Sequence, residues 1–243
     1  MDDITAGESC GHAAGHVTKL QDVMDSVCKD ASEDHMSLNV SKCATMQFHV
    51  GRTTPPPPNI TSNGQIVPFV NSAKLLGITI QSSLKWDLHV ENITAKANSK
   101  RYFLAVLRQA GIPATDLLRF YTTFVRPTVE YAAPVWHASL TGKQSDKVEA
   151  VQRSSLRTIF PDLSYRRALQ HTGLPTLHDR RVELCRTFAA SSLKNPAFAH
   201  WFPRKRGDCH SYHLRSNDKR GLPIMTQRLK NSPVNYAVKL LNE

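Results

Sequence analysis

Residues 86–113 read WDLHVENITAKANSKRYFLAVLRQAGIP, and they decide the fold of the longer part of the chain. Their apolar side chains recur every three to four residues, the spacing that places them on one face of an α-helix. These side chains are Leu88, Ile93, Ala97, Tyr102, Leu104 or Ala105, and Leu107. Gly111 tolerates a left-handed backbone and Pro113 cannot continue a helix, so the sequence predicts one long helix that ends before Gly111.

The same spacing continues downstream of Pro113 and predicts more helices. They cover residues 114–126, 142–159, 177–193 and 234–241. Between the last two, the segment that starts at Arg204 is basic and lacks helical periodicity. The region beyond residue 85 is therefore expected to be mostly α-helical.

Upstream of residue 85 the elements are expected to be short and mixed. The predicted features are a helix over 17–32, a half-buried strand over 43–50, a polyproline spacer over 55–58, and β-rich runs over 65–70 and 74–80. The two runs follow the turn dipeptide Asn63-Gly64 and are predicted to form a hairpin with a longer loop. The fold class is therefore predicted as α+β, a small antiparallel β/α part followed by a mostly helical one, with boundaries at 1–84, 85–203 and 204–243.

Charge is distributed unevenly along the chain. The 243 residues contain 31 Lys and Arg against 20 Asp and Glu, a net charge of +11. Residues 1–50 hold eight acidic and three basic side chains, so residues 51–243 carry +16. This balance favours an anionic partner, nucleic acid ahead of a membrane surface. A hydrophobic fraction of 40% excludes a disordered acidic tail or a collagen.

Cysteine usage and hydropathy give an expected location. The five cysteines are odd in number and irregularly spaced, and no charged segment followed by an apolar one opens the chain. The longest uncharged stretch, 53–73, contains five prolines, which is incompatible with a membrane helix. We therefore expect an intracellular protein that is neither secreted nor bound to a membrane.

Several local strings occur together in a fixed order. They are MDDITAGE at 1–8, MSLNVSK at 36–42, KLLGITI at 74–80, YTTFVR at 121–126, EYAAPVWH at 130–137 and FPDLSY at 160–165. In this order the strings resemble the later part of non-LTR (LINE-type) retrotransposon reverse transcriptases. The first three resemble the Asp-Asp catalytic loop, the next polymerase motif and the primer-grip hairpin, and the others the thumb and C-terminal region. The resemblance therefore implies a palm remnant over 1–84 and a thumb-like domain over 85–203.

The resemblance implies that the parent enzyme is an RNA-directed DNA polymerase, whose two Mg²⁺ ions are held by carboxylates on adjacent strands. It makes Asp2 a metal ligand, Asp3 its catalytic neighbour, and Lys42 a residue near the triphosphate. The other metal-binding aspartate and the nucleotide-holding fingers would precede residue 1. The chain is thus expected to be inactive alone and to bind no cofactor or small-molecule substrate. Alternatively, all three residues are ordinary solvated side chains.

The resemblance also implies nucleic-acid contacts. Leu76 and Gly77 would bring backbone close to a primer, although a buried strand with a bulge is the alternative for Leu76. Phosphate contacts are expected from Lys96, Lys100, Arg101, Arg108 and Arg119. Tyr102 or Tyr121 would stack nearby, whereas a solvated helix face is the alternative for the basic residues. The expected partner is RNA or DNA without sequence preference.

Two other interpretations remain open. One is a polymerase fragment that becomes active when another chain supplies the missing fingers and early palm. The other starts from residues 74–111, which resemble the N-terminal domain of AlkB-type alkylation-repair homologues. Dioxygenase chemistry in that family needs a His-x-Asp pair and a distal His for Fe(II), and this sequence contains no His-x-Asp.

Overall fold

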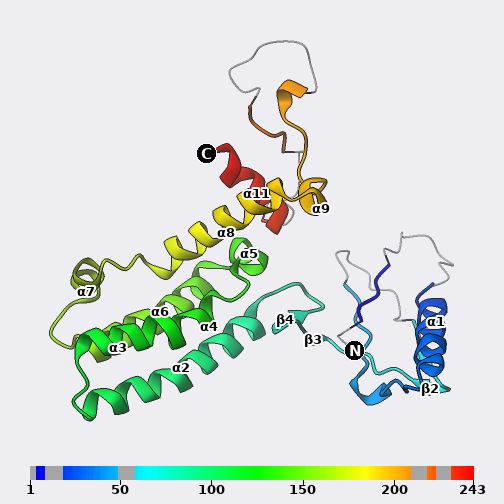
Figure 1. Cartoon of the computed structure of the whole chain (residues 1–243), viewed down its shortest axis with the longest axis horizontal. Coiled ribbons are helices and arrows are strands. Elements are labelled where there is room, and N and C mark those ends of the chain that lie inside the picture. The colour runs from blue at the N-terminus through cyan, green and yellow to red at the C-terminus, as the bar shows by residue number, and fades with distance from the viewer. Residues whose placement is uncertain (1–3, 9–18, 49–57, 209–217, 223–230) are drawn as a thin grey trace. The chain divides into compact units, whose positions relative to one another are not determined.

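A computed structural model describes residues 4–8, 19–48, 58–208, 218–222 and 231–243. The chain divides into two compact units, Met1–Lys85 and Trp86–Glu243, which we call the N-terminal unit and the helical unit (Figure 1). The described helices predominate over two small antiparallel sheets. The predicted α+β class with mostly helical content is therefore confirmed.

The N-terminal unit is built on helix α1, Leu20–Glu33, and a short 3₁₀ turn follows at Val40–Lys42. The side chain of Gln21 completes the hydrogen bonding of strand β1, Thr61–Ser62. Its Oε1 accepts from the Thr61 amide at 2.8 Å, and its Nε2 donates to the Thr61 carbonyl at 2.9 Å. One glutamine thus acts as the neighbour that the edge strand lacks, and it attaches the strand to the helix.

Two tight hairpins form the sheets of this unit. Strand β1 pairs with β2, Gln65–Ile66, and β3, Ser72–Leu75, pairs with β4, Ile78–Gln81. The turn residues have positive φ in both hairpins, 49° and 76° at Asn63-Gly64 and 46° and 83° at Leu76-Gly77. Positive φ at both central positions is the type I′ geometry, whose twist matches that of paired strands.

The expected pairing of run 65–70 with run 74–80 is wrong. Run 74–80 folds back on itself at Leu76-Gly77, and Gln65 pairs with Ser62. Leu76 occupies a turn and is 70% exposed, so the alternative of a buried strand with a bulge is also wrong at this position. Apolar composition suggested a continuous strand, whereas the glycine allowed a two-residue turn within it.

The expected strand over 43–50 is reduced to one bridge among its described residues, 43–48. Thr45 pairs in parallel with Phe69, through bonds from the Thr45 amide to the Pro68 carbonyl and from the Val70 amide to the Thr45 carbonyl, both 2.9 Å. Toward Cys43, the next bond of such a ladder would need an amide hydrogen on Pro68. Because proline has none, the ladder stops there. The polyproline run at 55–57 lies outside the described residues.

The helical unit begins with α2, Asp87–Gln109, and returns along an almost continuous second helix. That helix consists of α3, Ala114–Phe120, a π-helical turn η2, Tyr121–Val125, and α4, Arg126–Glu130. The predicted helix over 114–126 is therefore too short. It continues past Pro127 because this proline lies in the first turn of α4, where an amide hydrogen is not needed.

Further helices complete the unit. They are α5 Ala133–Trp136, η3 His137–Ser139, α6 Gly142–Ile159, α7 Tyr165–Thr172, α8 Leu177–Lys194, α9 Pro196–Ala199, η4 Arg206–Asp208 and α11 Pro233–Asn242. Three of them, α6, α8 and α11, match the predicted ranges 142–159, 177–193 and 234–241 to within one residue at each end. Helix α6 starts at a capping box between Thr141 and Gln144, and Thr176 caps α8. Local caps and apolar periodicity therefore fixed these bounds.

Helices α2 and α6 lie side by side and run in the same direction (Figure 1). Gln144, at the start of α6, donates to Asp87 at the start of α2 over 2.7 Å, and Arg108, near the end of α2, donates to the Thr158 carbonyl near the end of α6. The core around them contains fully buried side chains from most helices of the unit, among them Leu104, Leu117, Tyr121, Trp136, Leu156 and Leu177. This packing fixes which faces of α2 and α6 remain in solvent.

A second, smaller core attaches the C-terminal helix. Ala237 and Val238 of α11 pack with Ala189 of α8 and with Phe202. Helix α11 therefore packs against α8, within the same compact unit.

Candidate nucleic-acid interface

Of the three predicted catalytic residues, the structure describes Lys42 alone. Asp2 and Asp3 lie outside the described residues. Lys42 is exposed at the end of the 3₁₀ turn whose first residues are capped by Asn39. Within the described ranges, no group of three or more His, Cys, Asp and Glu side chains could hold a metal ion. The assignment of Asp2 to a Mg²⁺ site stays a prediction.

Leu76 and Gly77 lie together at the tip of the β3–β4 hairpin. Both are exposed. The hairpin that the resemblance implied at 74–80 is therefore present as a local structure. A contact of its tip with a primer stays a prediction.

The basic side chains of α2 separate into two groups, although four of them were predicted as one series. Lys100 donates to the Phe124 carbonyl at 3.1 Å and to the Thr128 hydroxyl at 2.8 Å, so its side of α2 faces η2 and α4. Lys96 lies one turn before Lys100 on the same side. Since successive residues are 100° apart on a helix, Arg101 points to a different side.

Arg101 and Arg108 lie on the side of α2 that faces α6. They are seven residues apart, which is two helical turns, and Arg108 reaches the Thr158 carbonyl of α6. Arg119, the remaining predicted residue, is exposed on α3 and does not lie on α2 or α6. The structure therefore brings two of the five predicted basic residues to the α2–α6 surface.

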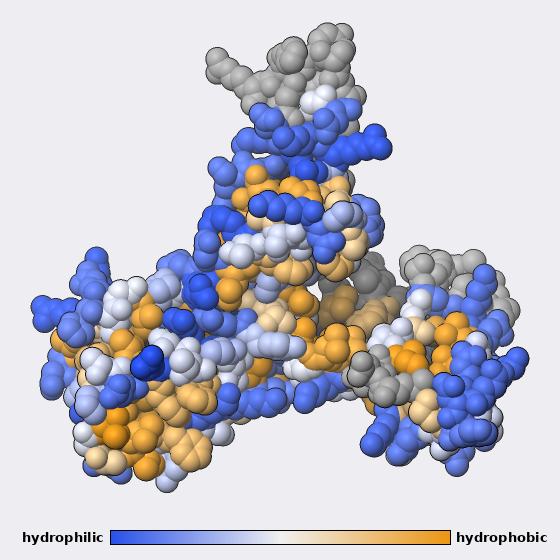
Figure 2. Space-filling view, in the orientation of Figure 1, coloured by the Kyte–Doolittle hydropathy of each residue, from blue (hydrophilic) through white to orange (hydrophobic). Residues whose placement is uncertain are grey.

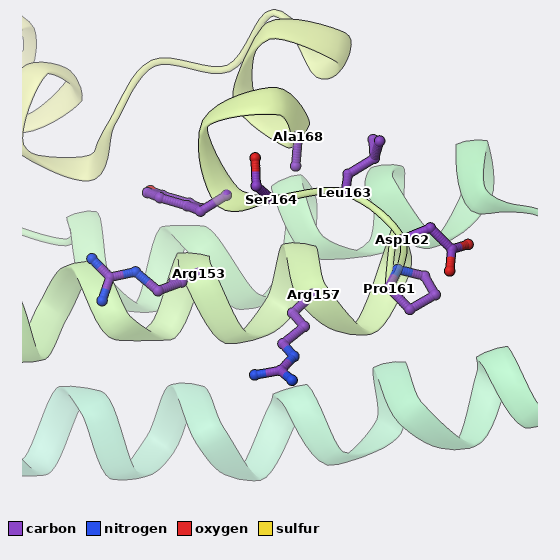
Figure 3. Close-up of a pocket in the computed structure, with 8 residues that line it drawn as sticks. Arg153, Arg157, Pro161, Asp162, Leu163, Ser164 and Ala168 are labelled. Carbon is purple, nitrogen blue, oxygen red and sulfur yellow. The ribbon is translucent and has the colours of Figure 1, made fainter.

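Two arginines that the sequence analysis did not select lie on α6, beside the loop that leads to α7. Arg153 and Arg157 are one turn apart and both are exposed. Figure 3 shows Arg157 extending from α6 on the side away from Ser164. We call Arg101, Arg108, Arg153 and Arg157 the arginine face. Their i, i+4 and i, i+7 spacings were visible in sequence, but the parallel pairing of α2 with α6 was not.

An open pocket of about 400 Å³ adjoins Arg153 and Arg157 (Figure 3). The loop after α6 and the first turns of α7 supply the rest of its lining, which includes Asp162, Leu163, Ser164 and Tyr165. The Arg153 guanidinium carbon lies 5.3 Å from the centre of the Tyr165 ring, a cation–π arrangement that positions the arginine. The pocket therefore gives the arginine face a concave margin.

Tyrosine hydroxyls beneath this surface form a fixed polar network. The Tyr165 hydroxyl donates to Glu149 and accepts from Gln152 Nε2 at 3.1 Å, and burial raises the pKa of this hydroxyl above its usual value. Tyr121 is fully buried and its hydroxyl donates to Gln152. Stacking by Tyr121 is therefore wrong because the ring lies in the core, whereas Tyr102 is 67% exposed.

Two acidic side chains of the unit, Glu130 and Glu149, are engaged at helix junctions. Glu130 is 11% exposed and lies 3.2 Å from Arg126 Nε and 3.4 Å from Arg180 Nε. Glu149 accepts from the Leu177 and His178 amides, both at 3.2 Å, and so caps α8. The helical unit contains 25 Lys and Arg against 12 Asp and Glu. Because these two carboxylates serve internal contacts, neither is available to neutralise the arginine face.

The chain resembles two curated proteins of Drosophila melanogaster. It is 24% identical over 158 residues to the probable RNA-directed DNA polymerase from transposon X-element, which covers 64% of this chain and 17% of that protein. It is 23% identical over 142 residues to the RNA-directed DNA polymerase from mobile element jockey, which covers 58% of this chain and 15% of that protein. The chain thus spans less than a fifth of the length of these relatives.

No protein-family model matches the chain. No solved structure matches it either. In the described residues, no helix combines the length and apolarity needed to cross a membrane. The descriptions of both relatives as RNA-directed DNA polymerases of mobile elements match the family that the sequence strings resemble. This chain therefore contains a segment related to the RNA-directed DNA polymerases of mobile elements.

Proposed function

We propose that this chain is the later part of a retrotransposon RNA-directed DNA polymerase, with a palm remnant over 1–84, a thumb-like domain over 85–203 and a basic segment over 204–243. In this proposal the helical unit binds RNA or DNA through its arginine face and without sequence preference. The observation that supports the proposal is the parallel pairing of α2 with α6, in which the Arg108–Thr158 contact brings the end of α2 next to the part of α6 that carries Arg153 and Arg157.

Arginine is suited to this task because its planar guanidinium remains charged and forms paired hydrogen bonds with phosphate oxygens. Contacts to phosphate position a protein on a nucleic acid without reading the bases. Each neutralised phosphate also releases counterions, so affinity falls as salt rises, with a slope in log–log form of about −0.9 per duplex phosphate. Four arginine contacts would give a slope of roughly −3 to −4.

The proposal also holds that the chain does not polymerise nucleotides alone. Two-metal nucleotidyl transfer needs carboxylates from more than one strand around both ions. By resemblance, two of these carboxylates are Asp2 and Asp3 of this chain. In the parent enzyme, they would hold Mg²⁺ together with a further aspartate. Nucleic-acid binding is therefore the property proposed for the chain by itself, within an intracellular setting.

The test is a binding titration of the full chain with a labelled DNA duplex between 50 mM and 200 mM salt. Arg153→Gln/Arg157→Gln removes two exposed charges that make no hydrogen bond within the described structure. We expect weaker binding and a salt slope that is less negative by about 2. Arg186→Gln on α8, whose charge pairs with Glu183 and Glu243, is the matched control and should leave the slope unchanged. Binding that is absent at low salt, or independent of salt, would overturn the proposal.

A further inference from the structure

Three large aromatic side chains of the helical unit are exposed near the α2–α3 hairpin. The exposed fractions are 67% for Tyr102, 58% for Phe103 and 57% for Phe124. Aromatic rings of this size usually dominate protein cores, so exposed rings that gather on one surface indicate an interaction site. Figure 2 shows hydrophobic residues gathered over the end of the unit where α2 passes into α3, bordered by hydrophilic residues.

Hydrogen bonds of Lys100 place two of these rings, Phe103 and Phe124, on one side of the hairpin. The Lys100 ammonium on α2 donates to the Phe124 carbonyl at 3.1 Å, which joins this turn of α2 to η2. Phe103 follows Lys100 by three residues and therefore lies on the same side of α2. We call Phe103, Phe124 and the neighbouring Tyr102 the aromatic face.

The rings of this face are already held in pairs. Tyr102 and Phe103 form an edge-to-face pair with centroids 5.9 Å apart. Phe124 stacks on Phe120, with centroids 5.1 Å apart and planes inclined by 22°. A ring that is held by a neighbour loses little conformational freedom when a flat ligand stacks on its other side.

Cations accompany the aromatic face. Lys96 is exposed one turn before Lys100 on the same side of α2, and Arg119, which precedes Phe120 in the chain, is exposed on α3. The binding of single-stranded nucleic acid needs this combination, because aromatic rings stack on unpaired bases while cations neutralise the phosphates. A duplex keeps its bases stacked inside, so it offers phosphates to the arginine face but no ring planes to the aromatic face.

We propose that the aromatic face binds single-stranded RNA or DNA by stacking unpaired bases on Phe103 and Phe124. The inference rests on the proposed function insofar as both surfaces bind nucleic acid, but the residues and the preferred form of the ligand differ. The arginine face lies about 100° around α2 from Lys100, because it begins at Arg101. The helical unit thus presents one surface to duplex phosphates and another to unpaired bases.

Affinity measurements with the full chain distinguish the two surfaces. Phe103→Leu/Phe124→Leu removes both rings and keeps apolar side chains at these exposed positions. We expect this variant to bind oligothymidylate about tenfold or more weakly and to bind a duplex within about twofold of the original chain. Phe198→Leu on α9, which removes another exposed ring, is the matched control and should change neither affinity.

Fluorescence provides a readout that depends on stacking. Phe103→Trp and Phe124→Trp each introduce an indole, and its emission should be quenched by oligothymidylate beyond the signal of the original chain. An abasic oligonucleotide of the same length has the phosphates but no bases and should bind without that quenching.

Each other outcome decides against one proposal or both. The proposal for the aromatic face is overturned if Phe103→Leu/Phe124→Leu binds oligothymidylate with unchanged affinity, or if the abasic strand quenches the indole equally. If the chain still binds the duplex, the proposal for the arginine face stands. Ring-dependent binding of oligothymidylate without any duplex binding overturns the arginine face alone. Self-association that the leucine variant abolishes, without a change in oligothymidylate affinity, assigns the rings to a second copy and overturns the inference. If the chain binds none of the three ligands at low salt, both proposals fail.

Discussion

The hydroxyl of Tyr121 donates a 2.7 Å hydrogen bond to the side-chain oxygen of Gln152 inside the helical core. The same glutamine donates through Nε2 to the Tyr165 hydroxyl at 3.1 Å and to the Pro175 carbonyl at 2.9 Å. Gln152 is 1% exposed, so a single amide satisfies polar groups from η2, α7 and the segment before α8. Burial of these groups is tolerated because each of them has a partner.

Gln152→Leu should therefore destabilise the helical unit strongly. Leucine has a similar volume, but it leaves the Tyr121 hydroxyl and the Pro175 carbonyl without their partner. The expected loss is about 2–4 kcal/mol in the free energy of unfolding, measured by urea denaturation. The additional change Tyr121→Phe should cost little in the Gln152→Leu variant, since the partner of the tyrosine hydroxyl is already gone. Additive losses would show that the two side chains are not coupled.

Stability should fall in mild acid because two buried histidines resist protonation. Burial lowers the pKa of His89 and of His137 from 6.5 to about 4, with further lowering from Lys96 for His89 and from Arg181 and His178 for His137. The unfolded chain takes up these protons near pH 6.5, whereas the folded chain does so only near pH 4. The stabilisation is thus complete above pH 6.5 and is lost as the pH falls toward 4.

Urea denaturation across this range checks the prediction. His137→Gln should weaken the pH dependence by about one proton, and His171→Gln on α7, an exposed histidine, is the control that should not. The same pH dependence in His137→Gln as in the original chain would contradict the assignment.

Leu76→Asn should stabilise the β3–β4 hairpin. Leu76 has a φ of 46°, a left-handed backbone conformation. This conformation raises the free energy of a non-glycine residue by about 1 kcal/mol, whereas asparagine tolerates it. We expect slower amide hydrogen exchange in β3 and β4 by about 3- to 5-fold, which corresponds to a gain of about 0.5–1 kcal/mol.

The β1–β2 hairpin provides the control for Leu76→Asn, because Asn63 already occupies the equivalent position at a φ of 49°. Asn63→Leu should speed up amide exchange there by a similar factor. If Leu76→Asn also leaves nucleic-acid affinity unchanged, the implied primer contact at this tip is not made by the leucine side chain.

Glu149→Gln should loosen the start of α8. The carboxylate accepts from the Leu177 and His178 amides and lies at the positive end of the helix dipole. The neutral amide retains one acceptor but loses the charge, so we expect a loss of about 1–2 kcal/mol. Hydrogen exchange at these two amides should accelerate, whereas Asp146→Asn, on the exposed side of α6, should leave it unchanged.

Local sequence was sufficient for most of the helices. The ranges 142–159 and 177–193 follow from apolar periodicity, and the structure places α6 and α8 at these positions with at most one residue of difference. Positions 43–50 and 74–80 were predicted less well. A strand needs a partner elsewhere in the chain, and Pro68 has no amide hydrogen with which to extend the pairing of Thr45 with Phe69 toward Cys43.

The sequence by itself determined that this protein has a basic helical part and strings typical of retrotransposon polymerases, because charge and short motifs are properties of residues near one another in the chain. Tertiary structure decided which charges act together. It directed Lys100 toward Phe124, buried Tyr121, and aligned Arg108 with the end of α6, about 50 residues later. The helical period sets the angle of a side chain on its own helix, but only core packing decides which helix lies beside it.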